Sequence, residues 1–311
     1  MVTYKNIKEF NNPVHTAITI GTFDGVHLGH QKIIKRLIAT SRANELNATI
    51  LTFFPHPRMV LQQNEELKLI TTLEEKIALL KKMGLDQLII HPFTKDFSRL
   101  SAHEFVTELL VNQLHVKKMI VGYDHRFGRN RTATIKDLVE YGDSYHFEVE
   151  EISAEEINEV SISSTKIRKA LHEGDIATAN LYLGYPFMLT GIITQGKGLG
   201  KQLTFPTANL YIEETYKLIP KNGAYIVKSL LKEREVYGMM NIGYNPTVNG
   251  TKKTIEVHFF DFDEDLYGQK IQVHLLERLR NEQKFDSVAV LKEQLKKDKE
   301  NALAYIKNSN A

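Results

Sequence analysis

Ile18-Thr-Ile-Gly-Thr-Phe-Asp-Gly-Val-His-Leu-Gly-His30 is the stretch that decides the fold of the first half of the chain. A β-prone run ends at Ile20, a turn containing three glycines follows, and apolar residues then recur at helical spacing. A strand, a glycine turn and a helix in this order direct free backbone N–H groups and the positive helix end toward a phosphate. His27 and His30 lie three residues apart where the helix opens, so both imidazoles can reach one anion. Each ring can donate a hydrogen bond or, when protonated, add positive charge.

Two other interpretations of this stretch stay open at the level of spacing. It could be a glycine-rich turn whose histidines are only polar surface residues. A zinc pair is disfavoured, because a third ligand at close spacing is missing.

Length and composition bound the class of protein. A chain of 311 residues predicts about two domains. Lys and Arg number 40 against 38 Asp and Glu, so the net charge of +2 favours neither a nucleic acid nor a membrane partner. The chain has no cysteine, which excludes disulfide partners and thiolate metal sites. No apolar segment is long enough for a leader or a membrane span, so we expect a soluble cytoplasmic protein.

Further strand-like runs follow in the first half and alternate with helical patterns, which indicates βαβ units and a parallel sheet. They cover residues 48–54, 88–91, 118–122 and 147–152. Pro55-His56-Pro57 breaks the first of these runs at its carboxyl end, where open α/β sheets bind their ligands. A rigid loop is the alternative.

Two polar clusters also follow strand ends. Residues 122–131 combine three arginines, one carboxylate and two aromatic rings, although a solvated charged turn remains an alternative. Ile162-Ser-Ser-Thr-Lys-Ile-Arg168 opens a helix, and Lys166 and Arg168 stand where cations oppose the helix dipole. A bound anion would compensate these cations, whereas N-capping by Ser163 or Ser164 explains only the serines.

The periodicity changes from helical to alternating beyond Gly184-Tyr-Pro186. Regularly spaced strand-like runs without intervening helices predict an antiparallel barrel, and a terminal helix begins near residue 286. We therefore place the domains at 1–184 and 185–311.

The second half also holds three candidate groups. Gln195-Gly-Lys-Gly-Leu-Gly-Lys-Gln202 is a basic loop suited to phosphate, although it fails the P-loop pattern. Thr207 and Asn209 are two residues apart and face one side of an extended backbone, where their neutral oxygens suit magnesium, or else they form turn hydrogen bonds. Glu256 projects from the face opposite an apolar stripe, as either a catalytic base or an ordinary outward carboxylate.

The first half resembles the nucleotidyltransferases with a His-x-Gly-His signature, and in particular their FMN adenylyltransferase (FAD synthetase) branch. The resemblance lies in residues 21–30, in Pro-His-Pro, in Gly-x-Asp-x-Arg-Phe-Gly and in Ser-Ser-Thr-x-Ile-Arg. It implies a Rossmann-like domain in which His27, His30 and Arg168 are catalytic. It also implies ATP contacts by Gly21, Phe23, Asp24, Gly29, Ser163, Ser164, Thr165 and Lys166, and flavin contacts by Pro55, His56, Pro57, Asp124 and Phe127. The chain departs from the family pattern at His125 and Asn130.

The second half resembles riboflavin kinase. The matching strings are the glycine loop, Phe205-Pro-Thr-Ala-Asn209, Asn241-Ile-Gly243, Asp265-Leu-Tyr-Gly268 and residues 279–287. The resemblance implies a six-stranded Greek-key β-barrel with a terminal helix, with Glu256 as base and Thr207 and Asn209 at the metal. It also implies ATP contacts by Gly196, Gly198, Gly200 and Lys201, and flavin contacts by Arg280, Glu282 and Phe285.

Both resemblances together imply a bifunctional enzyme that converts riboflavin to FMN and FMN to FAD. The expected partners are riboflavin, FMN, FAD, ATP, ADP and pyrophosphate. Mg2+ would arrive with ATP, and no permanently bound prosthetic group is expected. One alternative is a riboflavin kinase whose first domain only binds nucleotides or docks. Another is a different small-molecule cytidylyl- or adenylyltransferase that carries an unrelated β-barrel binding domain.

Overall fold

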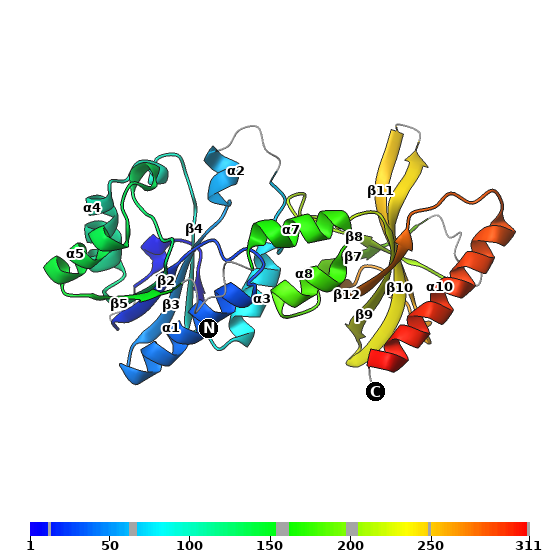
Figure 1. The fold of residues 1–311 in the computed structure, drawn as a ribbon, viewed down its shortest axis with the longest axis horizontal. Coiled ribbons are helices and arrows are strands. Elements are labelled where there is room, and N and C mark those ends of the chain that lie inside the picture. The colour runs from blue at the N-terminus through cyan, green and yellow to red at the C-terminus, as the bar shows by residue number, and fades with distance from the viewer. Residues whose placement is uncertain (12–13, 62–66, 154–161, 197–204, 248–249, 310–311) are drawn as a thin grey trace. The chain divides into compact units, whose positions relative to one another are not determined.

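The computed structural model describes residues 1–11, 14–61, 67–153, 162–196, 205–247 and 250–309 (Figure 1). The chain forms two compact units, Met1–Ser164 and Thr165–Ala311. Each unit has its own sheet and is described by itself.

The first unit is built on a six-stranded, all-parallel sheet with the order β1-β4-β3-β2-β5-β6. Its strands are β1 (Val2–Tyr4), β2 (Thr16–Ile20), β3 (Asn47–Phe53), β4 (Gln87–His91), β5 (Val116–Gly122) and β6 (Glu148–Ile152). The expected parallel sheet is confirmed. β1 escaped prediction because three residues that are mostly exposed carry no alternation to read.

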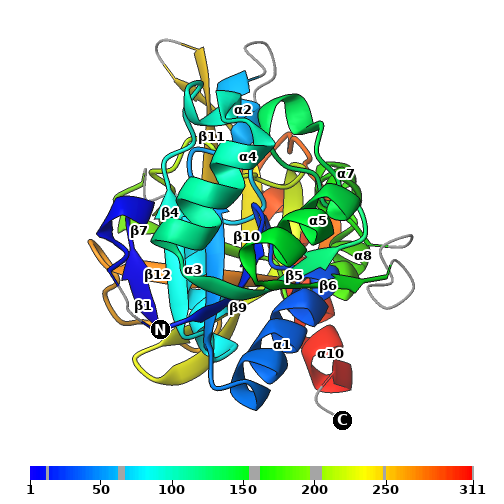
Figure 2. The same cartoon turned by 90° about the vertical axis from the view of Figure 1, so that its left-hand side faces the viewer.

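Helices cover both faces of this sheet. They are η1 (Ile7–Glu9), α1 (Leu28–Ala43), α2 (Pro57–Leu61), α3 (Leu73–Lys82), η2 (Phe97–Arg99), α4 (Ala102–Glu104), η3 (Phe105–Gln113), η4 (Arg129–Arg131) and α5 (Ile135–Tyr145). Neighbouring residues of β2 enter different cores: Ala17 packs with Leu37 of α1 and Leu80 of α3, whereas Ile18 packs with residues of η3 and α5. Figure 2 shows α1 and α5 on opposite sides of β5 and β6.

The order of the strands reverses direction at β2. From β2 the chain proceeds through β3 and β4 toward one edge, and then returns to place β5 and β6 on the other side. Ligands of open α/β sheets bind at such a switch point, outside the carboxyl ends of the strands. The turn after β2 and the polar loop after β5 both emerge there.

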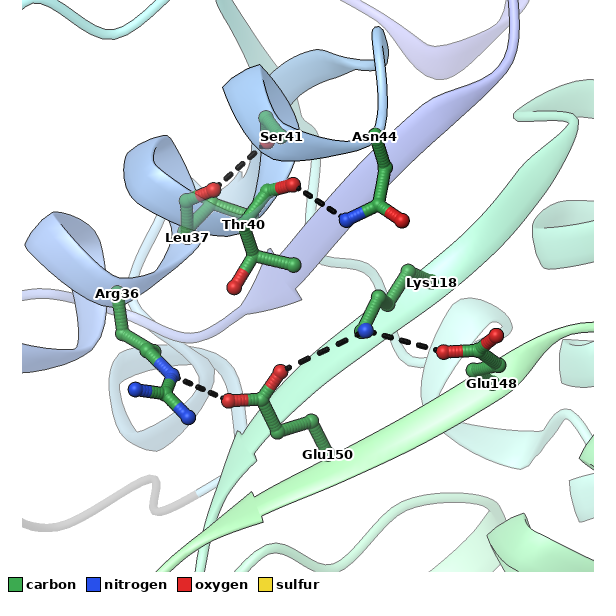
Figure 3. Close-up of polar contacts among 8 residues, drawn as sticks. All are labelled: Arg36, Leu37, Thr40, Ser41, Asn44, Lys118, Glu148 and Glu150. Atoms are coloured by element: carbon green, nitrogen blue, oxygen red, sulfur yellow. Dashed lines mark hydrogen bonds and ion pairs between the residues drawn. The ribbon is translucent and has the colours of Figure 1, made fainter.

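A ladder of alternating charges ties α1 to the strands at one edge of the sheet (Figure 3). Arg36 of α1 contacts Glu150 of the edge strand β6. The Lys118 ammonium of β5 lies 3.9 Å from Glu150 and 3.0 Å from Glu148. Charged side chains on an edge strand also discourage pairing with another chain, so the ladder protects this edge.

The second unit is a closed, antiparallel barrel with the strand order β10-β11-β8-β7-β12-β9. Its strands are β7 (Met188–Thr194), β8 (Ala208–Tyr211), β9 (Gly223–Leu231), β10 (Arg234–Thr247), β11 (Gly250–Phe259) and β12 (Lys270–Asn281). The six-stranded barrel that the resemblance implied is confirmed. The pattern alone missed β8, because four residues that begin two positions after Pro206 are equally compatible with a turn.

The described residues of the second unit form three helices: α7 (Ser164–Glu173), of which all but the first residue lies there, α8 (Ile176–Leu183) and α10 (Val288–Ser309). The Asn180 side chain of α8 donates to the Leu275 carbonyl of β12 and accepts the Phe187 N–H. Such contacts explain why α7 and α8 group with the barrel, although we expected them in the first domain. The functional boundary at 184 stays a prediction.

Candidate active sites

His27 occupies the N-cap of α1 at the switch point of the first sheet. Its side chain is 3% exposed, and Nδ1 accepts the backbone N–H of His30 at 3.4 Å. A neutral imidazole has one donor and one acceptor nitrogen, so this contact assigns the proton to Nε2. His27 can therefore cap the helix with one nitrogen and donate to an anion with the other.

The His30 ring stacks on the His27 ring, with centroids 3.6 Å apart and planes at 19°. Burial, followed by electrostatic opposition from His27 and Lys76 to a second positive charge, holds the pKa of His30 well below its usual value. The ring is thus neutral at pH 7. Among the described residues its buried Nδ1 has no hydrogen-bond partner, which leaves that atom for a ligand.

The turn before α1 stores backbone strain. Phe23 and Val26 are both buried and adopt left-handed φ angles of 47° and 37°. Such a conformation is unusual for a bulky or β-branched residue and costs about 1–3 kcal/mol. Strain of this kind persists only where the surroundings impose it, and it concentrates at functional sites.

Asp24 fastens this turn to the segment before α3. Its carboxylate accepts the backbone N–H groups of Ile70 at 2.9 Å and Thr71 at 3.2 Å. The hydroxyl of Ser164 donates to the Asp24 carbonyl at 3.0 Å, so a residue of the second signature string reaches the first. The structure thus gives Asp24 a positioning task, and an ATP contact by it stays a prediction.

The contacts of the remaining residues that were predicted to bind the phosphates say less about their role. Gly21 donates its N–H to the Leu51 carbonyl, and Gly29 is buried in the first turn of α1. Ser163 precedes α7 and is half-buried. Thr165, Lys166 and Arg168 lie in the second compact unit, so their approach to the histidines stays a prediction.

The predicted flavin segments of the first unit follow β3 and β5. His56 accepts the Arg58 N–H on Nδ1 at the start of α2, between Pro55 and Pro57. Phe127 is 5% exposed and belongs to the apolar core, so a flavin contact by it stays a prediction.

His125 stacks on Phe127, and burial lowers its pKa to about 4. In the described part of the chain its buried Nε2 has no partner. Asp124 is exposed beside it. The neutral His125 ring thus packs against Phe127. His125 is the position at which the family that this half resembles often has Phe.

A cavity of about 430 Å3 adjoins these flavin segments. It is lined by Leu61, Lys95, Ser98, Arg99, Arg129 and Asn130. Of this group, only residues 129 and 130 were predicted from the sequence, as part of the polar loop. Lys95 and Arg99 were missed, because isolated basic residues in a loop give no signal of a shared cavity.

The candidate kinase site lies where β8 and β11 pair in the second unit. Glu256 is in register with Asn209, and the Thr207 hydroxyl donates to the Glu256 carboxylate at 3.3 Å. A Cβ added at Gly196 would meet the Asn209 amide at 2.0 Å, so the loop can approach Asn209 only through glycine. The structure therefore brings Glu256, Thr207, Asn209 and Gly196 together.

His258 holds the segment that carries these residues, a role that was not predicted from the sequence. It is 8% exposed on β11, and its Nδ1 lies 2.8 Å from the Pro206 carbonyl. Its ring meets Phe205 edge to face at 5.2 Å. Burial lowers the pKa of His258, so at neutral pH the uncharged ring donates to Pro206. This contact fixes the backbone next to Thr207.

Arg280 forms a buried fork with Asp298 of α10. The guanidinium Nη2 lies 2.7 Å and Nε 2.9 Å from the same carboxylate oxygen, and Gln294 also donates to Asp298. The Arg280 guanidinium also lies over the Phe285 ring, 5.6 Å from its centroid. This partner was not predictable, because Asp298 sits in a run of lysines on a helix.

Glu282, just after β12, bridges β10 and the residue before β9. Its carboxylate accepts the Tyr244 N–H at 3.0 Å and the Asn222 amide at 2.9 Å. Both Arg280 and Glu282 therefore organise the rim of the barrel, and flavin contact by them and by Phe285 stays a prediction.

The donor set of the kinase site fits a magnesium ion that phosphates already carry. A Thr hydroxyl and an Asn carbonyl supply neutral oxygens, the ligand type that Mg2+ accepts. The described residues hold no group of three or more His, Cys, Asp or Glu that could bind a metal by itself. Gly198, Gly200 and Lys201 lie outside the described residues.

These two sites define a class of protein: a nucleotide-binding α/β unit with a phosphate turn, joined to a β-barrel with a carboxylate facing neutral oxygens. The FAD synthetase family matches residues 9–166, and the riboflavin kinase family matches residues 183–306. The chain belongs to the family of bifunctional riboflavin kinase/FMN adenylyltransferases. The protein of that name from Buchnera aphidicola is 39% identical over 94% of both chains. The protein of that name from Bacillus subtilis is 35% identical over 94% of this chain and 93% of its own.

A solved structure from Streptococcus pneumoniae, that of a protein named as a macrolide-efflux protein, is similar over nearly the whole chain. It has a TM-score of 0.86 and 31% identity, and the match covers 96% of this chain and 97% of that one. In the described part of this chain, no helix is long and apolar enough to cross a membrane.

Proposed function

We propose that the two activities of this bifunctional enzyme are divided between its two units. The first unit forms FAD from FMN and ATP, and the second forms FMN from riboflavin and ATP. The observation that carries this division is that each unit holds its own signature group: stacked histidines at a switch point, and a carboxylate opposite Thr207 and Asn209.

In the barrel, the Glu256 carboxylate would accept the proton of the terminal ribityl hydroxyl. The hydroxyl oxygen then attacks the γ-phosphorus of ATP, and ADP leaves. Thr207 and Asn209 would hold Mg2+, which neutralises phosphate charge when it is bound. The Thr207 hydroxyl, which donates to Glu256, also keeps that carboxylate oriented.

The adenylyl transfer poses a different problem. The phosphate of FMN is already ionised, so its attack on the α-phosphorus of ATP needs no general base. Two anions must instead approach each other while pyrophosphate leaves. The Nε2–H of His27, the neutral ring of His30, and Lys166 and Arg168 would relieve this repulsion.

The substrates and the setting complete the proposal. We assign riboflavin, FMN, FAD, ATP, ADP and pyrophosphate as substrates and products, with Mg2+ supplied by ATP. The flavin of FMN would lie beside residues 55–57 and 124–127. Because ATP is a substrate of both reactions, we place the enzyme in the cytoplasm.

A time course tests the function directly. The purified protein is incubated with riboflavin, ATP and Mg2+, and the flavins are separated by chromatography. FMN should rise first and then give way to FAD. Accumulation of FMN without FAD would contradict the assignment of the first unit. Unchanged riboflavin would contradict the kinase assignment.

A further inference from the structure

A buried lysine lies directly beneath the phosphate turn of the first unit. Lys76 is in the first half of α3, and its side chain is only 5% exposed. The capping box of Thr72 and Glu75 fixes the start of this helix, so the position of Lys76 is set by its own element. None of the activities assigned above uses this residue.

The Lys76 ammonium holds the backbone of the turn by two contacts. It donates to the Thr22 carbonyl at 2.9 Å and to the Thr52 hydroxyl at 3.3 Å. The Thr52 hydroxyl itself donates to the Thr22 carbonyl at 3.3 Å. Lys76 therefore links α3, the end of β3 and the turn after β2.

The contact with the Thr22 carbonyl sets the direction of the next N–H group. The C=O and N–H of a trans peptide point in opposite directions, so a carbonyl turned toward Lys76 turns the Phe23 N–H away from it. In the described part of the chain, this N–H makes no hydrogen bond. The left-handed φ of Phe23 is part of the same arrangement. The turn thus presents one free donor on the side opposite Lys76.

The charge of Lys76 is also poorly compensated. No carboxylate among the described residues lies within ion-pair distance of its ammonium. Burial lowers the pKa of Lys76 to about 8, against the opposing effect of Asp24. The same ammonium helps to lower the pKa of His30, so its field reaches the stacked histidines. A buried cation without a carboxylate in direct contact is costly unless an anion approaches it.

We propose that Lys76 is a positioning residue for the phosphates of ATP in adenylyl transfer. It aims the Phe23 N–H at them and supplies a buried positive charge behind the turn. The anion that compensates this charge is the polyphosphate of the nucleotide. The proposal rests on the assignment of FAD formation to the first unit.

The test replaces Lys76 by methionine, which keeps the length of the side chain and removes the ammonium. FAD formation from FMN is followed at varied ATP, and riboflavin phosphorylation is measured in the same preparation. Loss of the buried charge and of the alignment of the Phe23 N–H with the phosphates should raise the KM for ATP in FAD formation about tenfold or more. The kinase should be unchanged. K76R should recover part of the ATP affinity, because it restores the charge.

K82M is the matched control, because Lys82 is an exposed lysine of the same helix. It should leave both activities unchanged. A folded K76M protein with a KM for ATP within about twofold of the wild type overturns the proposal, since a contact of this kind is worth more. A fall in kcat alone, without recovery in K76R, overturns it as well.

K76Q decides the matter if K76M does not fold. Its amide can still donate to a carbonyl, so this change removes the positive charge and keeps a polar side chain at the contact with Thr22. A several-fold rise in the KM for ATP supports the proposal, and an unchanged KM overturns it. Wild-type protein that forms no FAD from FMN would instead contradict the function assigned to the unit.

Discussion

At the scale of single residues, His27 has two tasks that belong to different ring nitrogens. Nδ1 caps α1, and Nε2 is the atom that can donate to a phosphate. Alanine at this position would remove both tasks, so that a loss of catalysis could not be distinguished from a loss of stability. Asparagine separates them, because it is a good N-cap residue but cannot reach as far as the imidazole.

H27N should therefore lose FAD formation and keep its stability. Removal of one preorganised donor lowers kcat by about a hundredfold. H27A should lose the same activity and, in addition, about 1 kcal/mol of unfolding free energy. Steady-state kinetics and urea unfolding of both variants measure the two effects. H27N with more than half of the wild-type activity would show that Nε2 makes no catalytic contact.

Lys76 predicts a pH dependence of FAD formation. Its pKa falls from 10.5 in the unfolded chain to about 8 in the folded protein. As pH rises through about 8 the folded protein loses the ammonium, so kcat/KM for ATP should decline. Asp24 and His30 are the titratable groups that act with Lys76. K76M should lack this decline, and an identical profile in both proteins would exclude Lys76 as its cause.

Stability should change in the opposite sense over the same range. Between pH 8 and 10.5 the unfolded chain binds more protons at Lys76 than the folded protein does. The contribution of this residue to the unfolding free energy therefore rises with pH. Relative to K76M, the wild type should therefore lose activity and gain stability as pH rises. These opposite trends would distinguish a charge that acts in the reaction from one that is merely structural.

Some of these residues could be predicted from the sequence, and others could not. The spacing of His27 and His30 after a strand and a glycine turn is a local pattern, and so is the alternation that exposes Glu256. Lys76 and His258 act through contacts with backbone from distant segments. A lysine in an amphipathic helix looks like a surface residue until the fold buries it.

At the scale of elements, α10 is fixed to the barrel by the fork between Arg280 and Asp298. Resemblance assigned Arg280 to the flavin, whereas the structure gives its guanidinium a buried carboxylate partner. The strand and the helix that carry this pair are adjacent in space but are joined by a loop, so neither segment alone predicts it. The same limit explains β1, whose place in the sheet depends on β4.

D298A should destabilise the second unit strongly. It removes the only carboxylate that the described residues offer to the largely buried Arg280 guanidinium, and breaking such a pair costs about 3–5 kcal/mol. Urea inactivation of the kinase should shift to lower concentration, while FAD formation from FMN resists as in the wild type. D286A is the control, because Asp286 is exposed and precedes the same helix. A change of less than about 1 kcal/mol, the range of a surface pair, would contradict the role of the fork.

The periodicity of the chain predicted most of the elements. Five parallel strands and the alternating runs of the barrel were readable, because apolar residues recur at spacings of 3.6 and two. Periodicity did not predict that α7 and α8 belong to the second unit. Their assignment depends on tertiary contacts such as that of Asn180 with Leu275.

At the scale of the whole molecule, one chain carries two ATP-dependent reactions in sequence. FMN is the product of the barrel and the substrate of the parallel-sheet unit. The two sites solve different problems: the kinase must deprotonate a neutral hydroxyl, and the adenylyltransferase must bring two anions together. Only the first needs a general base.

The most direct test of this account is FAD formation by E256Q, supplied with either riboflavin or FMN. We predict that E256Q makes neither FMN nor FAD from riboflavin, because the hydroxyl keeps its proton. From FMN and ATP the same preparation should form FAD at the wild-type rate. Loss of FAD formation from FMN would contradict the division of the two reactions, and FMN formation from riboflavin at the normal rate would contradict the role of Glu256.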